Sequence, residues 1–322
     1  MVGNSRPFLL LAATALIALV LGFTLPAQPK ILGVLNDLAH APVFGLVALI
    51  VLRLIHLRRQ PNTMRLSDYG IALLIAMGVG GLIELIQPFM ERDAELEDLL
   101  TDTLGAGCAL GLMLALNRQT RPARIKSAGR IAAATLGLLF GLWALLPLGQ
   151  GAVAYFERAA EFPIVARFSS PRDLYFISSP TAHLSLRPLP ERWARPDDAL
   201  SLRIDYSAGA AWPGASHDEP EPDWRGFSAL ALDLTNPAEA PLHLAVRVHD
   251  AAHDQRYEDR FNRAFEVMPL SRTVLRIPLR DIAAGPVGRS LDVARIAGIV
   301  VFEDSESAPA GGFFYLNKLW LE

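Results

Sequence analysis

The chain has 322 residues, a net charge of −3, 52% hydrophobic residues and a mean hydropathy of +0.29. This composition is apolar for a soluble protein, and the small net charge gives no reason to expect nucleic acid as a partner. The single cysteine, Cys108, excludes an internal disulfide and offers no metal-site spacing, so we expect neither a metal nor a cofactor. Apolar residues gather before about residue 150, which predicts two domains, 1–155 and 165–322.

Five apolar segments are each about as long as a bilayer requires, which is roughly 20 residues. The first is interpreted as an uncleaved helix, because its apolar run is long and Pro26-Ala27-Gln28 is a poor signal-peptide cleavage site. The sequence therefore predicts an all-α membrane bundle with five transmembrane helices. They are expected at about residues 7–25, 38–56, 69–89, 98–116 and 131–149.

Basic residues in the loops orient this bundle. The loop between the second and third segments carries Arg58, Arg59 and Arg65, and the loop between the fourth and fifth carries five more basic residues. Cytoplasmic loops are enriched in Lys and Arg. We therefore predict a multi-pass protein of a bacterial-type inner (plasma) membrane, with the lipid bilayer as a partner. Its N-terminus is expected in the cytoplasm and its C-terminal domain outside.

Polar residues from three separate stretches fall at the outer surface of the predicted bundle. Ionisable groups near bilayer depth are costly and usually pair around a site or a polar cavity. One interpretation is a candidate catalytic, headgroup-binding or proton-transfer site, with a carboxylate as base and His40 as acid or base. The other is a satisfied network that fixes helix packing. The residues are Asp37, His40, Glu84, Gln87, Arg92, Asp98 and Asp102.

The same residues carry a family resemblance over about residues 30–116. Asp37-x-x-His40, then Glu84-x-x-Gln87 with Arg92, then Asp98 followed by Asp102 and Gly105, resemble the VanZ-like family of small membrane proteins. Asp102 stands where that family usually has Asn. The resemblance implies a role in the cell envelope and in glycopeptide (teicoplanin) resistance, without implying a reaction.

The second half of the sequence changes to a period of two. Alternating runs bounded by turn residues such as Asn236-Pro237 predict an all-β antiparallel sandwich of about 150 residues. The expected strands are 201–206, 229–234, 242–248, 273–279, 296–303 and 313–321.

The order of these strands and turns resembles the jelly-roll carbohydrate-binding modules with a galactose-binding-like fold. The resemblance implies an envelope glycan or a lipid-linked saccharide as a ligand. Aromatic rings would stack on sugar faces and acidic groups would bind hydroxyls; core packing of the aromatics and ion pairing of Asp259 are the alternatives. The candidate ligand-binding residues are Trp212, Trp224, Asp250, Tyr257 and Asp259.

Three functions remain open at this point. The first is a membrane protein that acts on an envelope component, with the sandwich holding a glycan near the polar cluster. The second is a non-catalytic anchored scaffold or binding protein whose cluster is structural. The third is an enzyme that hydrolyses or transfers part of a lipid-linked sugar, although the sequence has no P-loop, G-x-S-x-G, HExxH or dinucleotide motif. Convergence of Glu84, His40 and Asp98 around a cavity would favour a site.

Overall fold

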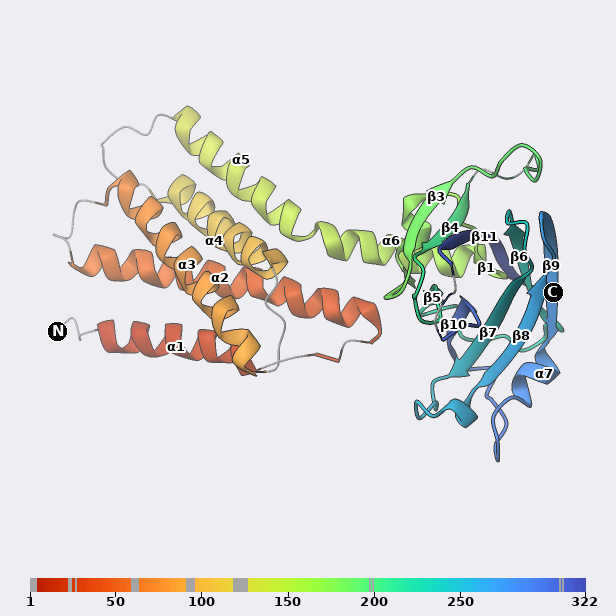
Figure 1. Cartoon of the computed structure of the whole chain (residues 1–322). Coiled ribbons are helices and arrows are strands. Elements are labelled where there is room, and N and C mark those ends of the chain that lie inside the picture. The colour runs from red at the N-terminus through yellow and green to blue at the C-terminus, as the bar shows by residue number, and fades with distance from the viewer. Residues whose placement is uncertain are drawn as a thin grey trace. The chain divides into compact units, whose positions relative to one another are not determined.

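The structure is a computed structural model that divides into two compact units, Met1–Ala152 and Val153–Glu322, which are described separately here (Figure 1). We call them the helical unit and the sandwich unit. The structure describes residues 5–22, 25–26, 28–58, 64–90, 96–117, 127–196, 198, 200–306, 308 and 310–322.

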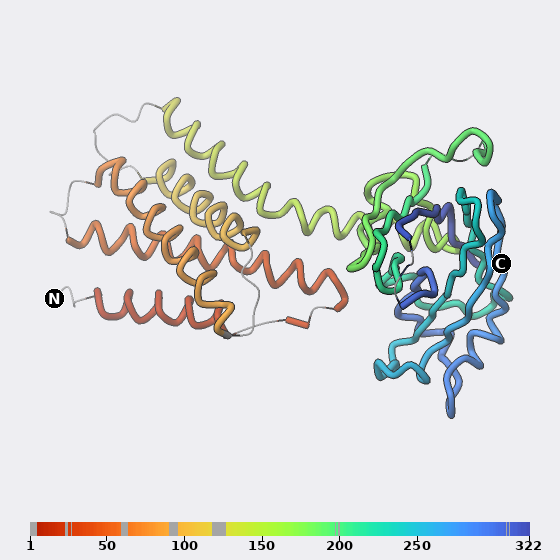
Figure 2. Tube along the Cα trace, viewed as in Figure 1, coloured from red at the N-terminus to blue at the C-terminus, as the bar shows by residue number. Residues whose placement is uncertain are grey.

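The helical unit is built from apolar helices, as the hydropathy predicted. Four of them, among the described residues, are long and apolar enough to cross a membrane: α2, α3 with its 3-10 extension, α4 and α5. With 17 residues, α1 is about 25 Å long, which is shorter than a hydrocarbon core of about 30 Å. Figure 2 shows α1 running beside α2. The helical architecture is confirmed, and the count of five spans stays a prediction. The elements are α1 Arg6–Gly22, α2 Lys30–Arg58, α3 Leu66–Ile86, η1 Gln87–Met90, α4 Leu96–Leu116 and α5 Ser127–Ala144.

The second helix is longer than expected. It begins at Lys30 instead of residue 38, because apolar residues such as Ile31 and Val34 continue the helix toward its N-terminus. Asp37 and His40 therefore lie about two turns or more inside α2, and not at its start. This placement is a correction to the sequence interpretation, and it puts His40 where neighbouring helices can pack on it.

Glycines let the helices approach closely. A Cβ added at Gly105 of α4 would lie 2.0 Å from the carbonyl oxygen of Ala41 in α2. On another face of α4, a Cβ at Gly107 would lie 2.6 Å from the Phe140 ring of α5, and one at Gly111 would lie 2.9 Å from the Ala133 oxygen. The Gly107-xxx-Gly111 spacing thus brings α5 against α4, as such spacings do between membrane helices.

The fifth predicted segment is divided in two. Helix α5 ends at Ala144, and α6 (Leu146–Glu161) follows after one turn residue, Leu145. Pro147 favours the interruption, because proline lacks an N–H and fits most easily in the first turn of a helix, where it lies in α6. The division between the two units falls within α6.

The sandwich unit consists of two antiparallel sheets. One has the strand order β3-β4-β11-β6-β9, with β1 pairing to β11, and the other has the order β2-β5-β10-β7-β8. Each of the six predicted strands is a strand, so the antiparallel β fold is confirmed. The strands are β1 Ile164–Ala166, β2 Ile177–Ser178, β3 His183–Arg187, β4 Ser201–Tyr206, β5 Gly214–His217, β6 Ala229–Asn236, β7 Leu242–Asp250, β8 Phe261–Val267, β9 Ser271–Pro278, β10 Ile296–Glu303 and β11 Gly312–Leu321.

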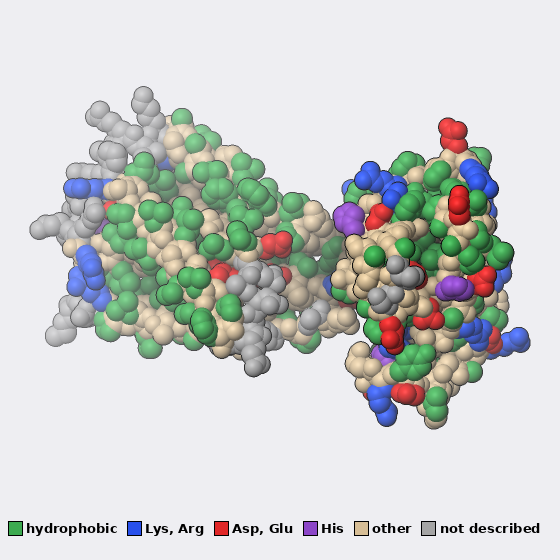
Figure 3. Space-filling view, in the orientation of Figure 1, with side chains coloured by type: hydrophobic (Ala, Val, Ile, Leu, Met, Phe, Trp, Pro, Cys, Tyr) green, Lys and Arg blue, Asp and Glu red, His purple; other side chains and the backbone are tan. Residues whose placement is uncertain are grey.

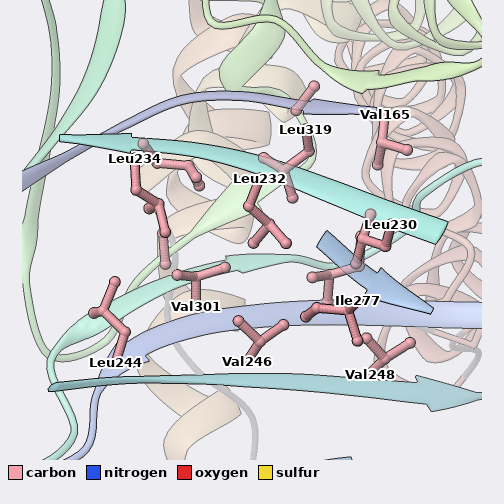
Figure 4. Close-up of a cluster of buried hydrophobic side chains, with 14 of the residues drawn as sticks. Val165, Leu230, Leu232, Leu234, Leu244, Val246, Val248, Ile277, Val301 and Leu319 are labelled. Carbon is pink, nitrogen blue, oxygen red and sulfur yellow. The ribbon is translucent and has the colours of Figure 1, made fainter. Parts of the chain in front are cut away.

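Alternate residues of the two sheets meet in one core. In Figure 4, Leu230 and Leu232 of β6 point toward Val246 and Val248 of β7. All four side chains are fully buried. The period of two in the sequence is therefore the period of side chains that alternate between the core and the outer face of each sheet.

Several elements were not predicted, namely the strands β1, β2, β3, β5 and β8 and one helix, and two of these bear on the edge of the sandwich. Strand β8 was missed because Arg263 occupies a core-side position at this sheet edge, with its guanidinium 5.2 Å from the Phe261 ring and ion-paired to Asp281. Helix α7 (Leu279–Ala283) follows β9 where the sequence indicated the end of a strand. Both differences lie at the edge of the sandwich, where burial is incomplete and the apolar pattern is weak.

The end of α6 belongs to the sandwich unit. Tyr155 donates a hydrogen bond to Glu219, and Arg158 donates one to the Glu219 carbonyl at 2.8 Å and pairs with Glu221 at 3.3 Å.

We expect a fragment of residues 153–322 to be soluble and to unfold cooperatively. It should exceed a 165–322 fragment by about 1–3 kcal/mol in unfolding free energy, since hydrogen bonds to charged groups are lost from the shorter one. Urea denaturation followed by circular dichroism measures this, and equal stabilities would contradict it.

Candidate functional site

A buried polar cluster joins three helices of the helical unit. His40 of α2 lies with its Nδ1 3.1 Å from Asp102 Oδ1 and its Nε2 3.9 Å from Asp98 Oδ2, both on α4. The side chains of His40 and Asp102 are 4% and 1% exposed, so this contact is made away from solvent. An imidazole between two carboxylates can hold or pass a proton, and it can equally tie two helices together.

Helix α3 adds two residues to this cluster. With the Gln87 amide oriented to satisfy its hydrogen bonds, its nitrogen donates to Glu84 Oε2 at 2.8 Å. Glu84 is close enough for its charge to act on both His40 and Asp102. Among the described residues, Asp102 Oδ2 is buried without a hydrogen-bond partner, and a Cβ added at Gly80 would lie 2.7 Å from it.

The seven predicted residues thus divide into three groups. Five converge: His40, Glu84, Gln87, Asp98 and Asp102. Asp37 is exposed on α2. Arg92 lies outside the described residues. All five converging side chains are buried, which leaves open whether they form a site or a structural network.

The predicted glycan contacts on the sandwich unit are mostly not available to a ligand. Trp224 is fully buried and donates from its indole nitrogen to the Glu221 carbonyl at 2.8 Å, so this prediction is corrected: Trp224 is a core residue. Asp250 and Asp259 are both bound by Arg289, at 2.6 Å from Nη1 to Asp250 Oδ2 and directly from Nε to Asp259. Their function is ion pairing within the fold, the alternative considered for Asp259.

Electrostatics support that interpretation. The hydrogen bond from Arg289 holds the pKa of Asp259 far below its usual range. Burial raises the pKa of Asp250, but the hydrogen bonds from Arg289 and from the Asp292 amide outweigh burial and lower it. His253, Asp254 and Asp259 offer metal-type ligand atoms within 4.8 Å of one another. The guanidinium on Asp259 opposes a cation there, because like charges in close contact repel.

Two predicted residues remain exposed aromatics. Trp212 is 50% exposed and follows β4, and Tyr257 is 60% exposed just before β8. The Tyr257 hydroxyl accepts a hydrogen bond from the Asn262 amide at 3.1 Å. Tyr257 is therefore held against the outer face of the sheet that ends in β8.

The sequence interpretation missed a polar group beside Tyr257, which we call the arginine face. Arg247 of β7 is the cross-strand partner of Asn262 in β8. His249 stands two residues after Arg247, and Arg260 stands two residues before Asn262 in an extended conformation, so all four side chains share the outer face. The period of two that was used to find the core also marks this face. It consists of Arg247, His249, Arg260 and Asn262.

Positive charge collects on the arginine face without acidic partners. Among the described residues, no carboxylate forms an ion pair with Arg247 or Arg260, and the Nε atoms of both are buried without a hydrogen bond. Instead, Arg247 lies over the Phe302 ring at 5.4 Å and Arg260 over the Tyr257 ring at 5.0 Å. Burial, His253 and Arg247 lower the pKa of His249 to about 4, so its imidazole is neutral at pH 7.

Comparison with known proteins gives structural similarity to the sandwich unit alone. No protein-family model matches the chain, and no curated protein matches it. The family 11 carbohydrate-binding module of Clostridium thermocellum, in complex with a β-1,3-1,4-mixed-linked tetrasaccharide, is 13% identical with a TM-score of 0.37. That alignment covers 49% of this chain and 93% of that one.

Two further structures are similar to the same extent. An exo-β-agarase is 15% identical with a TM-score of 0.40, over 49% of this chain and 25% of that one. The family 30 carbohydrate-binding module of a C. thermocellum cellulase is 11% identical with a TM-score of 0.34, over 49% of this chain and 95% of that one. These similarities concern the fold of the sandwich. The VanZ-like resemblance of the helical unit stays a prediction.

Proposed function

We propose that this protein is a membrane-anchored glycan-binding protein of the cell envelope, and that the outer face of β7 and β8 is its binding surface. The observation that carries the proposal is the arginine face beside the exposed ring of Tyr257. Guanidinium, imidazole and amide groups are planar hydrogen-bonding groups that match sugar hydroxyls, while an exposed aromatic ring can cover the apolar side of a sugar. Binding sites combine a few such polar groups with aromatic surface.

The test is calorimetric titration of the full chain in detergent micelles with a panel of neutral and charged oligosaccharides. Tyr257→Ala and Asn262→Ala should each lower the affinity for the tightest-binding oligosaccharide at least 10-fold, since each removes a direct contact. Glu239→Gln, an exposed change in the turn between β6 and β7, is the control and should leave affinity unchanged. Absence of binding across the panel would overturn the proposal.

We further propose that the sandwich unit lies outside the cytoplasm of a bacterial-type cell. In Figure 3, Lys and Arg side chains gather at the end of the bundle where α2 ends and α3 begins, which supports a cytoplasmic location for that end. A reporter that works only in the cytoplasm, fused after Glu322, is expected to be inactive, and a periplasmic reporter at the same position should be active. The reverse pattern would contradict this topology.

A second candidate function belongs to the buried cluster of the helical unit. His40 between two carboxylates, with Asp102 Oδ2 unpaired among the described residues, favours a proton-transfer or headgroup site. If the helical unit is VanZ-like, this site contributes to teicoplanin tolerance. The competing proposal is a non-catalytic scaffold in which the same residues only stabilise helix packing.

Substitution of Glu84 separates these alternatives. We expect Glu84→Gln, which is nearly isosteric, to abolish tolerance in a complemented deletion strain, while the protein accumulates and melts as the parent does. His40→Ala and Arg92→Ala should behave in the same way, whereas Glu97→Gln, exposed on α4, should be silent. Full tolerance with Glu84→Gln, or loss caused only by degradation, would favour the scaffold.

A further inference from the structure

Most arginines of the sandwich unit form ion pairs with carboxylates. Among the described residues, the exposed Arg187, Arg192 and Arg295 do not, and neither do the partly buried Arg247 and Arg260. Several of the paired guanidinium groups make two contacts with their carboxylate. Arg247 and Arg260 instead share one face with each other. The paired arginines include Arg203 with Asp205, Arg263 with Asp281, Arg272 with Asp198 and Asp233, Arg276 with Glu322, and Arg289 with Asp250 and Asp259.

Two neighbouring guanidinium groups without an ion-paired carboxylate repel each other. Burial lowers the pKa of Arg247, and the charge of Arg260 lowers it further. Burial likewise lowers the pKa of Arg260. Partial desolvation of like charges costs free energy, and an anion between them would recover it through charge-assisted hydrogen bonds. Glu258 is close enough for its charge to act on Arg260 and oppose part of this lowering, but it forms no ion pair with Arg260 among the described contacts.

We propose that the arginine face recognises an anionic group (a carboxylate, sulfate or phosphate) on the bound saccharide, with Arg247 and Arg260 as its two ligands. This inference rests on the proposed glycan-binding function and narrows it to acidic glycans. Asn262 and neutral His249 lie beside the two guanidinium groups and are placed to bind neighbouring hydroxyls. Tyr257 adds an apolar surface for the sugar ring.

Space for a saccharide adjoins these residues. Tyr257, Arg260 and Asn262 line one end of an open pocket of about 440 Å³, which continues along the edge strand β8 to Gly285 and Val287. Glu258 and the ion pair of Arg263 with Asp281 also line it, so among the described lining residues the unpaired positive charge in this pocket is that of Arg260. Ligand pockets typically have volumes of about 300–1,000 Å³. The pocket begins at the arginine face, so a sugar held there would bring its substituent to Arg260.

The experiment compares matched oligosaccharides on the full chain in detergent micelles. The probes are cellotetraose, its β-1,4-linked glucuronate tetramer, sulfated cellotetraose and phosphorylated cellotetraose. We expect at least one charged probe to bind 10-fold or more tightly than cellotetraose in 50 mM NaCl. That advantage should shrink in 0.5 M NaCl because salt screens partly exposed charges. The charged probe that binds most tightly identifies the anionic group.

Variants test the assignment to two residues. Arg247→Gln and Arg260→Gln should each lower the affinity for the charged probe at least 10-fold more than the affinity for cellotetraose, and so remove the advantage of the charged probe. Arg276→Gln, in β9 of the other sheet and paired with Glu322, is the matched control and should retain the advantage. Cooperative melting verifies folding, and Arg247→Lys, which keeps the charge without the planar fork, should restore part of the affinity if Arg247→Gln fails to fold.

The outcomes separate the two proposals. Equal binding of charged and neutral probes, unaffected by either arginine variant, would overturn the anionic site and leave the glycan-binding function standing. An equal loss of the charged probe's advantage with Arg276→Gln would also overturn it, because the effect would then be general electrostatic attraction. Binding of none of the probes, here or in the broader panel, is the result that overturns the glycan-binding function itself.

Discussion

Arg272→Met is expected to destabilise the sandwich unit by about 3 kcal/mol, because it removes the closest charged partner of a buried carboxylate. Arg272 Nη2 lies 2.6 Å from Asp233 Oδ2, and the same guanidinium binds Asp198. The side chains of Arg272 and Asp233 are 7% and 5% exposed, so water cannot replace the lost contacts. Asn317, which donates to Asp233 Oδ1 at 3.0 Å, would remain as an uncharged partner, and the half-exposed Arg195 would remain as a weaker charged one, with its Nη1 3.4 Å from Asp233 Oδ2.

Chemical denaturation of the 153–322 fragment measures this loss. Arg276→Met is the control, since Arg276 is also on β9 and pairs with Glu322 but its side chain is 57% exposed. Exposed ion pairs contribute about 1 kcal/mol or less. A change below about 1 kcal/mol for Arg272→Met would show that the buried network is not a stability determinant.

The same network predicts how stability depends on pH. The hydrogen bond from Arg272 lowers the pKa of Asp198 in the folded protein. A carboxyl with a lowered folded pKa stabilises the fold above its unfolded value of about 3.9, and this contribution is lost as pH falls through the folded value. The parent should therefore lose stability below about pH 4, and Arg272→Met should show a shallower loss there.

Periodicity made the elements of this protein predictable. Strand β6 alternates leucines at 230, 232 and 234 with smaller or polar residues, and the structure buries those leucines in the core. Apolar runs likewise predicted the helices. The start of α2 was misplaced because a hydropathy window ends where polar residues begin, whereas a helix continues until its hydrogen bonding is interrupted.

Pairings between distant residues were not predictable in this way. Asp250 and Asp259 resemble ligand-binding residues in sequence, since they are polar and flank a turn. Their partner, Arg289, is 39 and 30 residues away, and only the fold brings it to them. Trp224 is similar: an aromatic residue in a polar stretch, Asp223-Trp224-Arg225, looks exposed, but its ring fills the core.

The arginine face was missed for a similar reason. Arg247 is an outward position of a predicted strand, but β8 was not recognised, so Arg260 and Asn262 had no known neighbours. Once β8 is paired with β7, Asn262 lies opposite Arg247. Strand register converts residues that are far apart in sequence into a single surface.

Gly105→Val is expected to have the largest effect in the helical unit, with a loss of about 3 kcal/mol or more, or no folded protein at all. A Cβ at this position would lie 2.0 Å from the Ala41 carbonyl oxygen and 2.5 Å from its Cα, which are backbone atoms that cannot rotate away. Helices α2 and α4 would have to separate. Ala41 directly follows His40, and Gly105 lies three residues after Asp102, so the separation would also break the 3.1 Å contact between those two side chains.

Accumulation in membranes and thermal aggregation in detergent measure this effect. The control is Gly81→Val in α3, because a Cβ at Gly81 meets nothing within 4 Å and valine carries the same helix propensity cost there. Gly105→Ala should already lower the melting temperature, since even one methyl group reaches the Ala41 backbone. A Gly105→Val protein that melts as the Gly81→Val protein does would contradict the close packing of α2 on α4, and with it the buried contact between His40 and Asp102.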